Sequence, residues 1–216
     1  MHRVISVFLL VGTFSVAYAQ RPAVSVCPKD MKWMLKYAAP NGKSDDGNER
    51  LLRLPCFRTA MRSAFPANHS ILGNTVSVAE AADIYTQVYA QGPVSQANRY
   101  ITIEGCVPHS CPNTGMIWID TLDKGAIVFA ASEEIVTYPI TPKSFSGKFH
   151  LWIYSTLAPL DVNEPKKLPS QLIGSLNTVF ANEAIASVTL IQSDGRLQSV
   201  TPETFQLHAP QQQAAR

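Results

Sequence analysis

The sequence lacks a surplus of either charge, a long apolar run beyond its first residues, and the short motifs of common active sites. It has 18 Lys and Arg residues against 16 Asp and Glu residues, so no strong field would attract nucleic acid or an anionic membrane surface. No apolar stretch reaches the ~20 residues that a membrane-spanning helix needs. The Gly-x-Ser-x-Gly, His-Glu-x-x-His and phosphate-loop motifs are absent. We therefore expect no nucleic-acid partner, no membrane span, no cofactor, no metal and no enzyme activity.

The first residues have the pattern of a secretory signal peptide. His2 and Arg3 precede an apolar run over residues 4–16, and the small-x-small triplet Ala17-Tyr18-Ala19 follows, as at a signal-peptidase site. We predict a signal peptide over residues 1–19, a single domain over residues 20–209, and a disordered tail over residues 210–216. The expected location is periplasmic or secreted, in soluble form.

Four cysteines follow the predicted signal peptide. An even number of cysteines in an oxidising compartment indicates two disulfides, for which three pairings are possible. Proximity in the sequence favours Cys106 with Cys111, which leaves Cys27 with Cys56. The larger loop would tie the N-terminal segment to the body, and the smaller one would shape a local loop.

Before residue 100, the apolar residues recur at the spacing of an amphipathic helix. This spacing predicts a short helix over residues 31–38, another over residues 57–65 that ends at Pro66, and a third that begins at the capping box Ser77-Val78-Ala79-Glu80. A polar loop is expected over residues 41–48.

After residue 100 the period changes to that of strands. Strands are expected over residues 100–103, 116–119, 126–130, 149–154, 188–191 and 196–200. The last two would be joined by a two-residue turn at Asp194-Gly195, and one more helix is expected over residues 172–180. The predicted fold is α+β: an antiparallel sheet with flanking helices and a disulfide-closed loop that protrudes between two strands.

The segment Cys106-Val107-Pro108-His109-Ser110-Cys111 joins the first two of these strands. A disulfide over so few residues, together with the fixed φ of Pro108, would hold the His109 side chain out from the body in one orientation. A side chain that is ordered before binding loses little entropy in a partner's cleft. We predict that Val107, Pro108, His109 and Ser110 form a target-binding loop.

A strand, Cys-x-Pro-His-x-Cys, a second strand and a turn into a third strand resemble the inhibitor of vertebrate lysozyme (Ivy) family over about residues 98–131. The resemblance implies a periplasmic protein whose loop enters the lysozyme cleft. Cys106 and Cys111 match the loop disulfide, Pro108 the proline, and His109 the histidine that touches the two catalytic carboxyl groups. The resemblance also implies a homodimer.

Val107 and Ser110 stand where the family usually has a lysine and an acidic or amide residue, and they would line the rim of the cleft. Lysozyme cleaves with one protonated and one ionised carboxyl group a short distance apart. The two nitrogens of an imidazole can meet one group each. The expected function is inhibition of a lysozyme-like peptidoglycan glycosidase, with a lysozyme or another lytic peptidoglycan-cleaving enzyme as the partner.

The same residues allow other interpretations. Cys106 and Cys111 could belong to an exported thiol-disulfide redox protein, but such sites favour Cys-x-x-Cys at a helix N-terminus. Cys106, His109 and Cys111 could bind a metal, but export favours oxidation and a fourth ligand is lacking nearby. A structural cell-envelope protein, in which the loop has no binding role, is the third alternative.

The remaining polar and aromatic residues indicate structure more than function. Four carboxylates near predicted turns could serve a hydrolase, but charged residues there are usually solvated; they are Asp120, Asp123, Glu133 and Glu134. Trp33, Trp118 and Trp152 are more typical of a core than of a sugar groove. The scattered His69, His150 and His208 are expected to be structural or exposed.

Overall fold

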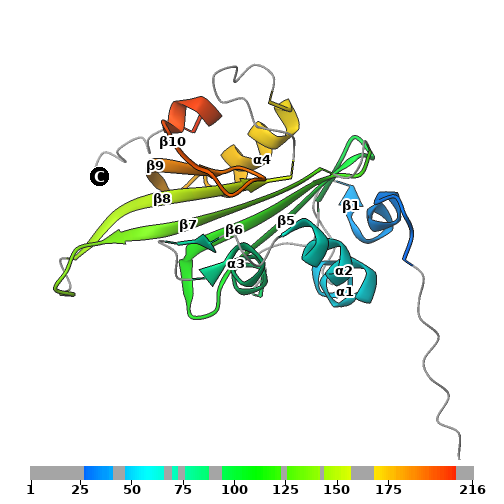
Figure 1. Ribbon diagram of the computed structural model, residues 1–216, viewed down its shortest axis with the longest axis horizontal. Helices are drawn as coiled ribbons and strands as arrows, with labels where there is room; N and C mark the ends of the chain where they lie inside the picture. The colour runs from blue at the N-terminus through cyan, green and yellow to red at the C-terminus, as the bar shows by residue number, and fades with distance from the viewer. Residues whose placement is uncertain are drawn as a thin grey trace, which may run out of the picture.

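The computed structural model describes residues 27–40, 47–65, 70–72, 76–87, 94–122, 126–141, 144–156 and 168–207. Its main element is an eight-stranded sheet with the strand order β1-β4-β5-β6-β7-β8-β9-β10 (Figure 1). β1 (Ala39–Pro40) and β4 (Val94–Gln96) lie at one edge, and β10 (Leu197–Val200) forms the other. The short strands β2 (Ser70–Ile71) and β3 (Val76–Ser77) pair separately.

The centre of the sheet is an antiparallel meander of four long strands. These are β5 (Tyr100–Val107), β6 (Ser110–Asp120), β7 (Ile127–Val136) and β8 (Phe145–Ser155). Residues 115–120 of β6 and 127–132 of β7 are buried without alternation. Strands buried in this way have both faces covered, so the apolar runs of the sequence produce a layered sheet rather than a one-sided one.

One face of the sheet is covered by helices from the N-terminal part of the chain. They are the 3₁₀ helix η1 (Lys32–Tyr37), α1 (Gly47–Arg53), α2 (Pro55–Ala64) and α3 (Val78–Tyr85). Phe57 of α2 shares a core with Ile117 and Phe129 of the sheet. α3 begins at the predicted capping box, where Glu80 N–H donates to the Ser77 hydroxyl and Ser77 N–H donates to the Glu80 carboxylate.

The other face is covered by the C-terminal part of the chain. α4 (Ser170–Val179) and the 3₁₀ helix η3 (Pro202–Phe205) contribute Leu172, Leu176 and Phe205 to a core with Trp118 and Leu151. α4 lies in the connection from β8 to β9 (Ala184–Ile191), and β9 pairs parallel to β8, as a helical crossover permits. The C-terminal helix and hairpin are therefore an integral part of the domain core.

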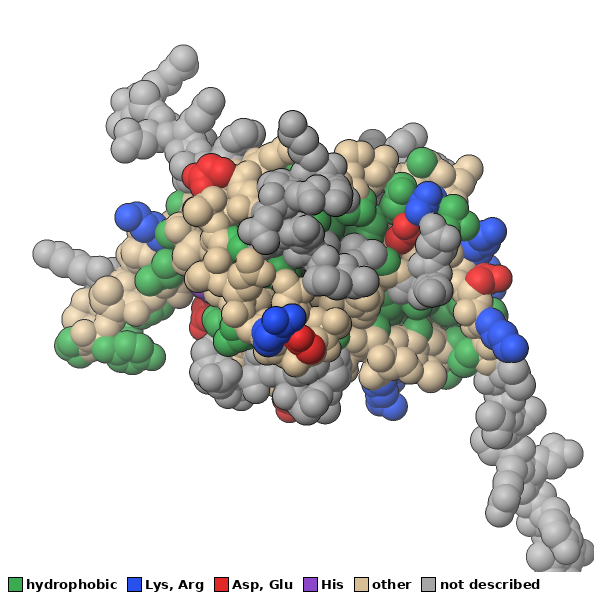
Figure 2. Space-filling model, turned by 45° about the horizontal axis from the view of Figure 1, so that its top comes forward, with side chains coloured by type: hydrophobic (Ala, Val, Ile, Leu, Met, Phe, Trp, Pro, Cys, Tyr) green, Lys and Arg blue, Asp and Glu red, His purple; other side chains and the backbone are tan. Residues whose placement is uncertain are grey.

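The predicted fold class is confirmed, since the protein is α+β with a mostly antiparallel sheet and helices on its faces. Both disulfides form as favoured, Cys27 with Cys56 and Cys106 with Cys111. In the described ranges, no helix combines the length and the hydrophobicity that crossing a membrane requires. On the surface drawn in Figure 2, basic and acidic side chains are interspersed.

Two local predictions of structure were wrong. Gly47 and Asn48 were expected in a polar loop but begin α1, whereas residues 41–46 of that loop lie outside the described residues. The β9–β10 turn has three residues instead of two, because Gln192 N–H donates to the Arg196 carbonyl oxygen at 2.9 Å. Gly195 has φ of 84°, which fits a three-residue hairpin loop with glycine in the left-handed position.

The prediction of a solvated Asp120 was also wrong. Asp120 is buried, and Arg99 donates to its two carboxylate oxygens from Nε at 2.8 Å and from Nη2 at 2.7 Å. Sheet pairing brings these two residues together across 21 positions of sequence, so the local context of Asp120 could not reveal its partner. Asp123, His69, His208, the signal peptide and the C-terminal tail lie outside the described residues.

Candidate binding site: the disulfide-closed hairpin

The predicted binding loop is the crest of the β5–β6 hairpin. β5 ends at Val107 and β6 begins at Ser110, so only residues 108 and 109 lie outside a strand. The register shifts after Cys106, where residues 111–113 of β6 have no partner on β5. Extra residues on one strand form a bulge, which bends the strand and re-aims the side chains near it.

Pro108 and His109 make a tight turn at this crest. His109 has φ of 62°, and a proline followed by a residue with positive φ is the pattern of a type II turn. A left-handed backbone costs a non-glycine residue on the order of 1 kcal/mol and persists only where the surroundings impose it. The Cys106–Cys111 disulfide, whose Cα atoms are 4.9 Å apart, closes the hairpin directly below. The fold thus presents an exposed imidazole on a constrained backbone.

Asn113 connects the crest to the neighbouring strand β7. Its side-chain amide donates to the Ser110 hydroxyl at 3.1 Å, and its side-chain carbonyl accepts from Glu134 N–H at 3.2 Å. Thr114 N–H donates to the Ser132 hydroxyl at 3.0 Å, and this hydroxyl donates to the Thr114 carbonyl at 3.3 Å. At Asn113 and Thr114, side-chain hydrogen bonds therefore connect β6 to β7. The backbone pairing of the two strands begins at Gly115.

Helix α3 packs against the base of the hairpin at Gly115. A Cβ atom at this position would lie 2.4 Å from the Tyr85 Cβ atom and 2.9 Å from the Tyr85 carbonyl oxygen. No larger residue fits unless the helix moves. Tyr85 in turn packs edge-on against Phe129 in the core. The hairpin is therefore fixed at its base to the helical layer as well as to the sheet.

A buried carboxyl group lies at the junction of the hairpin with β7 and β9. Glu183, just before β9, is buried, and its Oε2 atom has no hydrogen-bond partner among the described residues. Burial raises the pKa of Glu183 to about 7, the hydroxyls of Ser132 and Thr114 oppose the rise, and the charge of Glu104 adds to it. Burial also raises the pKa of Glu104, two residues before Cys106. Glu183 therefore titrates near neutral pH instead of in the acidic range.

The four predicted loop residues lie together, although their binding role stays a prediction. His109 is exposed, Pro108 and Ser110 are half-buried, and Val107 packs against the core under the helices. Sequence reasoning missed Asn113. Its position just after the cysteine loop was an available signal, because asparagine side chains near turns often bond to nearby groups.

Sequence reasoning also missed Glu183. Nothing in its local sequence marks it, because its burial depends on strands that come much earlier in the chain. Of the two other predicted carboxylates that the structure describes, Glu133 is half-buried on β7, and Glu134 accepts a hydrogen bond from Gly147 N–H at 3.0 Å.

The described part of the chain contains no group of three or more His, Cys, Asp or Glu side chains that could hold a metal ion. Its second histidine, His150, is half-buried. His150 on β8 has its ring nitrogens 2.6 Å from the Ser187 hydroxyl and 3.0 Å from the Thr189 hydroxyl. Burial lowers its pKa, so this histidine has the structural environment that was expected.

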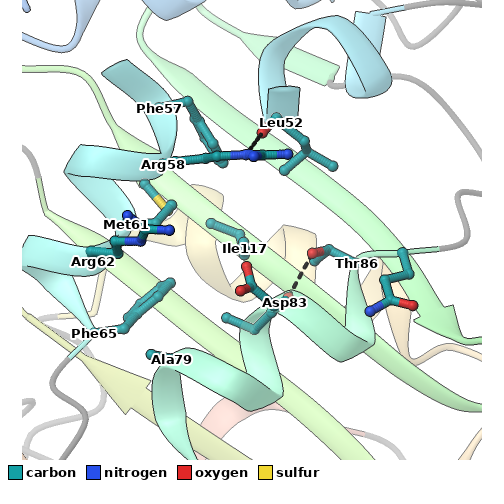
Figure 3. A pocket seen from close by; sticks show the side chains of 12 residues that line it. Leu52, Phe57, Arg58, Met61, Arg62, Phe65, Ala79, Asp83, Thr86 and Ile117 are labelled. Atoms are coloured by element: carbon teal, nitrogen blue, oxygen red, sulfur yellow. Dashed lines mark hydrogen bonds between the residues drawn. The ribbon is translucent and has the colours of Figure 1, made fainter. Parts of the chain in front are cut away.

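A pocket of about 350 Å³ lies between α2 and α3 (Figure 3). Its apolar lining includes Phe57, Met61, Phe65 and Ile117, and Arg58, Arg62 and Asp83 also border it. Arg58 Nε donates to the Leu52 carbonyl oxygen at 3.2 Å. The volume suits a small molecule. The pocket could not be predicted from the sequence, because its lining comes from four separate elements, α1, α2, α3 and β6.

Comparisons with models of protein families, with curated proteins and with solved structures found no match to this chain. The fold and the site define an α+β protein with a disulfide-closed hairpin that carries a histidine at its crest. The resemblance to lysozyme inhibitors accordingly rests on the residues of this hairpin and its flanking strands.

Proposed function

We propose that this chain is a periplasmic or secreted inhibitor of a lysozyme-like peptidoglycan glycosidase, which it blocks by inserting His109 into the catalytic cleft. The observation that carries the proposal is an exposed histidine on a two-residue crest closed by its own disulfide. The disulfide, Pro108 and the left-handed backbone of His109 leave the crest little freedom. The contact energy of the imidazole is then not offset by the entropy of ordering a loop.

The shape of the hairpin suits insertion into a cleft. Because β5 and β6 run almost to the crest, the part that enters is narrow and the part that follows is rigid. Val107 and Ser110 flank the crest, so they are the residues that would meet the rim of the cleft. The Ser110 hydroxyl also accepts from the Asn113 amide at 3.1 Å, which orients it before binding.

The chemistry of an imidazole suits the catalytic pair of a glycosidase. Such enzymes hold one protonated and one ionised carboxyl group at about 5 to 9 Å. Protonated His109 would donate a hydrogen bond to each group, and neutral His109 would donate to the carboxylate and accept from the acid. In both cases the groups that must act on the glycosidic bond are occupied, so the substrate is excluded.

The direct test is a pull-down with immobilised c-type and g-type lysozymes and a lytic transglycosylase, followed by assays of peptidoglycan cleavage. His109→Ala should weaken inhibition by about 1 to 4 kcal/mol, as hot-spot truncations do. Gln206→Ala is the matched control, because Gln206 is also exposed and also has a positive φ, of 56°. Its inhibition should equal that of the wild type.

Proton uptake on binding tests whether the imidazole of His109 lies between the two catalytic carboxyl groups. A carboxylate pair favours the imidazolium, so complex formation should take up protons and affinity should fall as pH rises from mildly acidic to alkaline values. Calorimetry in buffers of different ionisation enthalpy would measure the uptake. Equal inhibition by His109→Ala, or a complex without proton uptake near neutral pH, would contradict the mechanism. Dithiol-disulfide exchange by Cys106 and Cys111, with no lysozyme bound, would favour the redox alternative.

A further inference from the structure

Strands β7 and β8 extend beyond the rest of the sheet as a two-stranded arm. β6 pairs with β7 no further than Ala131, and β9 pairs with β8 only from Lys148 onward. β7 and β8 pair with each other as far as Val136 and Phe145. We call the described residues 133–141 and 144–147 the arm. In Figure 1 it projects from the left end of the sheet.

The end of the arm is apolar and exposed to solvent. Tyr138 is 84% exposed, Ile140 61% and Phe145 55%, and Ile135 nearer the sheet is 37% exposed. Among the described residues, Leu197 on β10 is the one other large exposed hydrophobic side chain. Figure 2 shows hydrophobic side chains gathered at the end of the projection on the left. A cluster of this kind, unlike a single exposed side chain, marks an interaction site.

Hydrogen bonds around Ser144 hold this tip in place. The buried Ser144 hydroxyl donates to the Pro139 carbonyl at 2.9 Å and accepts from Thr141 N–H at 2.8 Å. Thr137 N–H donates to the Ser144 carbonyl at 3.1 Å, and Ser144 N–H donates to the Thr141 carbonyl at 2.9 Å. An isolated two-stranded hairpin is marginally stable in water. The tip is therefore ordered by local hydrogen bonds of the Ser144 side chain and backbone. In this conformation the apolar side chains of the tip are exposed.

The arm and the disulfide hairpin leave the same end of the sheet. Since β6 and β7 are antiparallel, the first residues of β6 lie beside the last residues of β7. The bond from Glu134 N–H to Asn113 links the two hairpins directly. A protein that received His109 would lie on the side of the molecule from which the arm projects.

We propose that the apolar tip of the arm is a second contact with the enzyme that receives His109, and that it docks in an uncharged apolar depression beside the catalytic cleft. This inference rests on the proposed function. The tip exposes on the order of 500 Å² of apolar side chain, less than the about 800 Å² per partner of a stable interface. It is too small for a tip-to-tip dimer, whereas the disulfide hairpin adds area on the same side. Residues 135–141 and 144–147 carry no charged side chain. Lys143 is the one charged residue in the intervening sequence, so the tip favours an apolar complementary surface.

The test compares two sets of exposed apolar residues in the full chain, on the lysozyme or transglycosylase that the wild type binds. The triple variant Tyr138→Ser, Ile140→Ser and Phe145→Ser should raise Kd at least about tenfold, whereas the control Leu197→Ser should change Kd less than about twofold. At saturating concentration the triple variant should still inhibit fully, because His109 is intact. Tyr138→Ser alone should raise Kd in the same direction, and its side chain supports no packing that folding needs.

The outcomes separate this inference from the proposed function. An unchanged Kd in the triple variant, with an unchanged melting temperature, overturns the arm contact and leaves the role of His109 standing. If the wild type binds none of the three enzymes, both proposals fall. Self-association in sedimentation, or flotation with phosphatidylethanolamine–phosphatidylglycerol vesicles, that the triple variant loses would assign the tip to a second copy or to lipid, and would also overturn the inference.

Discussion

Two hairpins at one end of the sheet reach an ordered crest by different physical means. The β5–β6 hairpin is closed by the Cys106–Cys111 disulfide, and it presents a polar imidazole. The arm is held by hydrogen bonds around Ser144, and it presents apolar side chains. A disulfide constrains the unfolded chain as well as the native one, whereas hydrogen bonds of this kind act in the folded state. The first crest depends on redox conditions, and the second depends on a few local contacts.

Glu183, buried next to Thr114 of the first hairpin and Ser132 of β7, should produce the largest effect. Its pKa is raised to about 7 from an ordinary value of 4.5, so between these values the folded state holds a proton that the unfolded state has released. Stability should therefore fall by about 3 kcal/mol as pH rises through this window. Glu183→Gln should abolish this fall and gain that amount above neutral pH. Urea unfolding at about pH 4 and about pH 8 measures it.

The control for this titration is Asp83→Asn, at an exposed position on α3. It should leave the pH dependence of unfolding as in the wild type. A Glu183→Gln variant with the wild-type slope between acidic and neutral pH would show that Glu183 is already solvated.

Removal of the hairpin disulfide should act on one crest and spare the other. Cys106→Ser with Cys111→Ser should cost about 2 kcal/mol of chain entropy without abolishing folding, and should weaken inhibition because binding must now order the loop. Amide exchange at Thr137 and Thr141 in the arm should stay unchanged. Faster exchange there would mean that the two hairpins are ordered as one unit.

The complementary change removes the Ser144 hydroxyl, which is the centre of the hydrogen bonds at the tip of the arm. Ser144→Ala leaves the Thr141 N–H and the Pro139 carbonyl without this partner, and should destabilise the tip locally by about 1 to 2 kcal/mol. Hydrogen exchange at Thr141 would report the change. Ser146→Ala, at an exposed serine two residues on, is the matched control and should have a smaller effect. Equal protection of Thr141 in both variants would contradict the assigned role of Ser144.

The smallest effect concerns the backbone of the histidine itself. His109→Gly relieves the left-handed conformation, at φ of 62°, but adds entropy to the unfolded chain, so the net gain in stability should be below about 1 kcal/mol. Gln206→Gly, at φ of 56°, should give a similar shift. Only the His109 variant should lose inhibition. Thermal unfolding of both variants beside the cleavage assay makes the comparison.

The sequence was sufficient for features that depend on local pattern. The apolar runs of β6 and β7, the capping box at Ser77 and the Cys106–Cys111 disulfide were predicted, because each has its signal within a short segment. The Cys27–Cys56 disulfide followed by elimination. The paired cysteines also placed His109 at a crest, and the structure adds the register shift and the brace from Asn113.

Features that depend on distant contacts were not predictable. The Arg99–Asp120 ion pair forms only once β5 and β6 are in register. The environment of Glu183 includes Ser132 and Thr114, which come from strands much earlier in the chain. The arm was not predicted, because the Pro, Ser and Gly residues between the strands expected at 126–130 and 149–154 show no alternating apolar pattern. In the structure, Ser144 completes a hydrogen-bonded tip there.

The parallel pairing of β9 with β8 sets the order in which the chain can fold. β5 to β8 can pair in sequence, because each strand contacts the next one through a short connection. Their second face, with Trp118 and Leu151, stays open until α4, β9 and η3 arrive. Closing that longer connection is slower than closing a hairpin. A nascent or truncated chain that ends before α4 therefore exposes an apolar sheet face, and aggregation competes with folding until the last segments have been made.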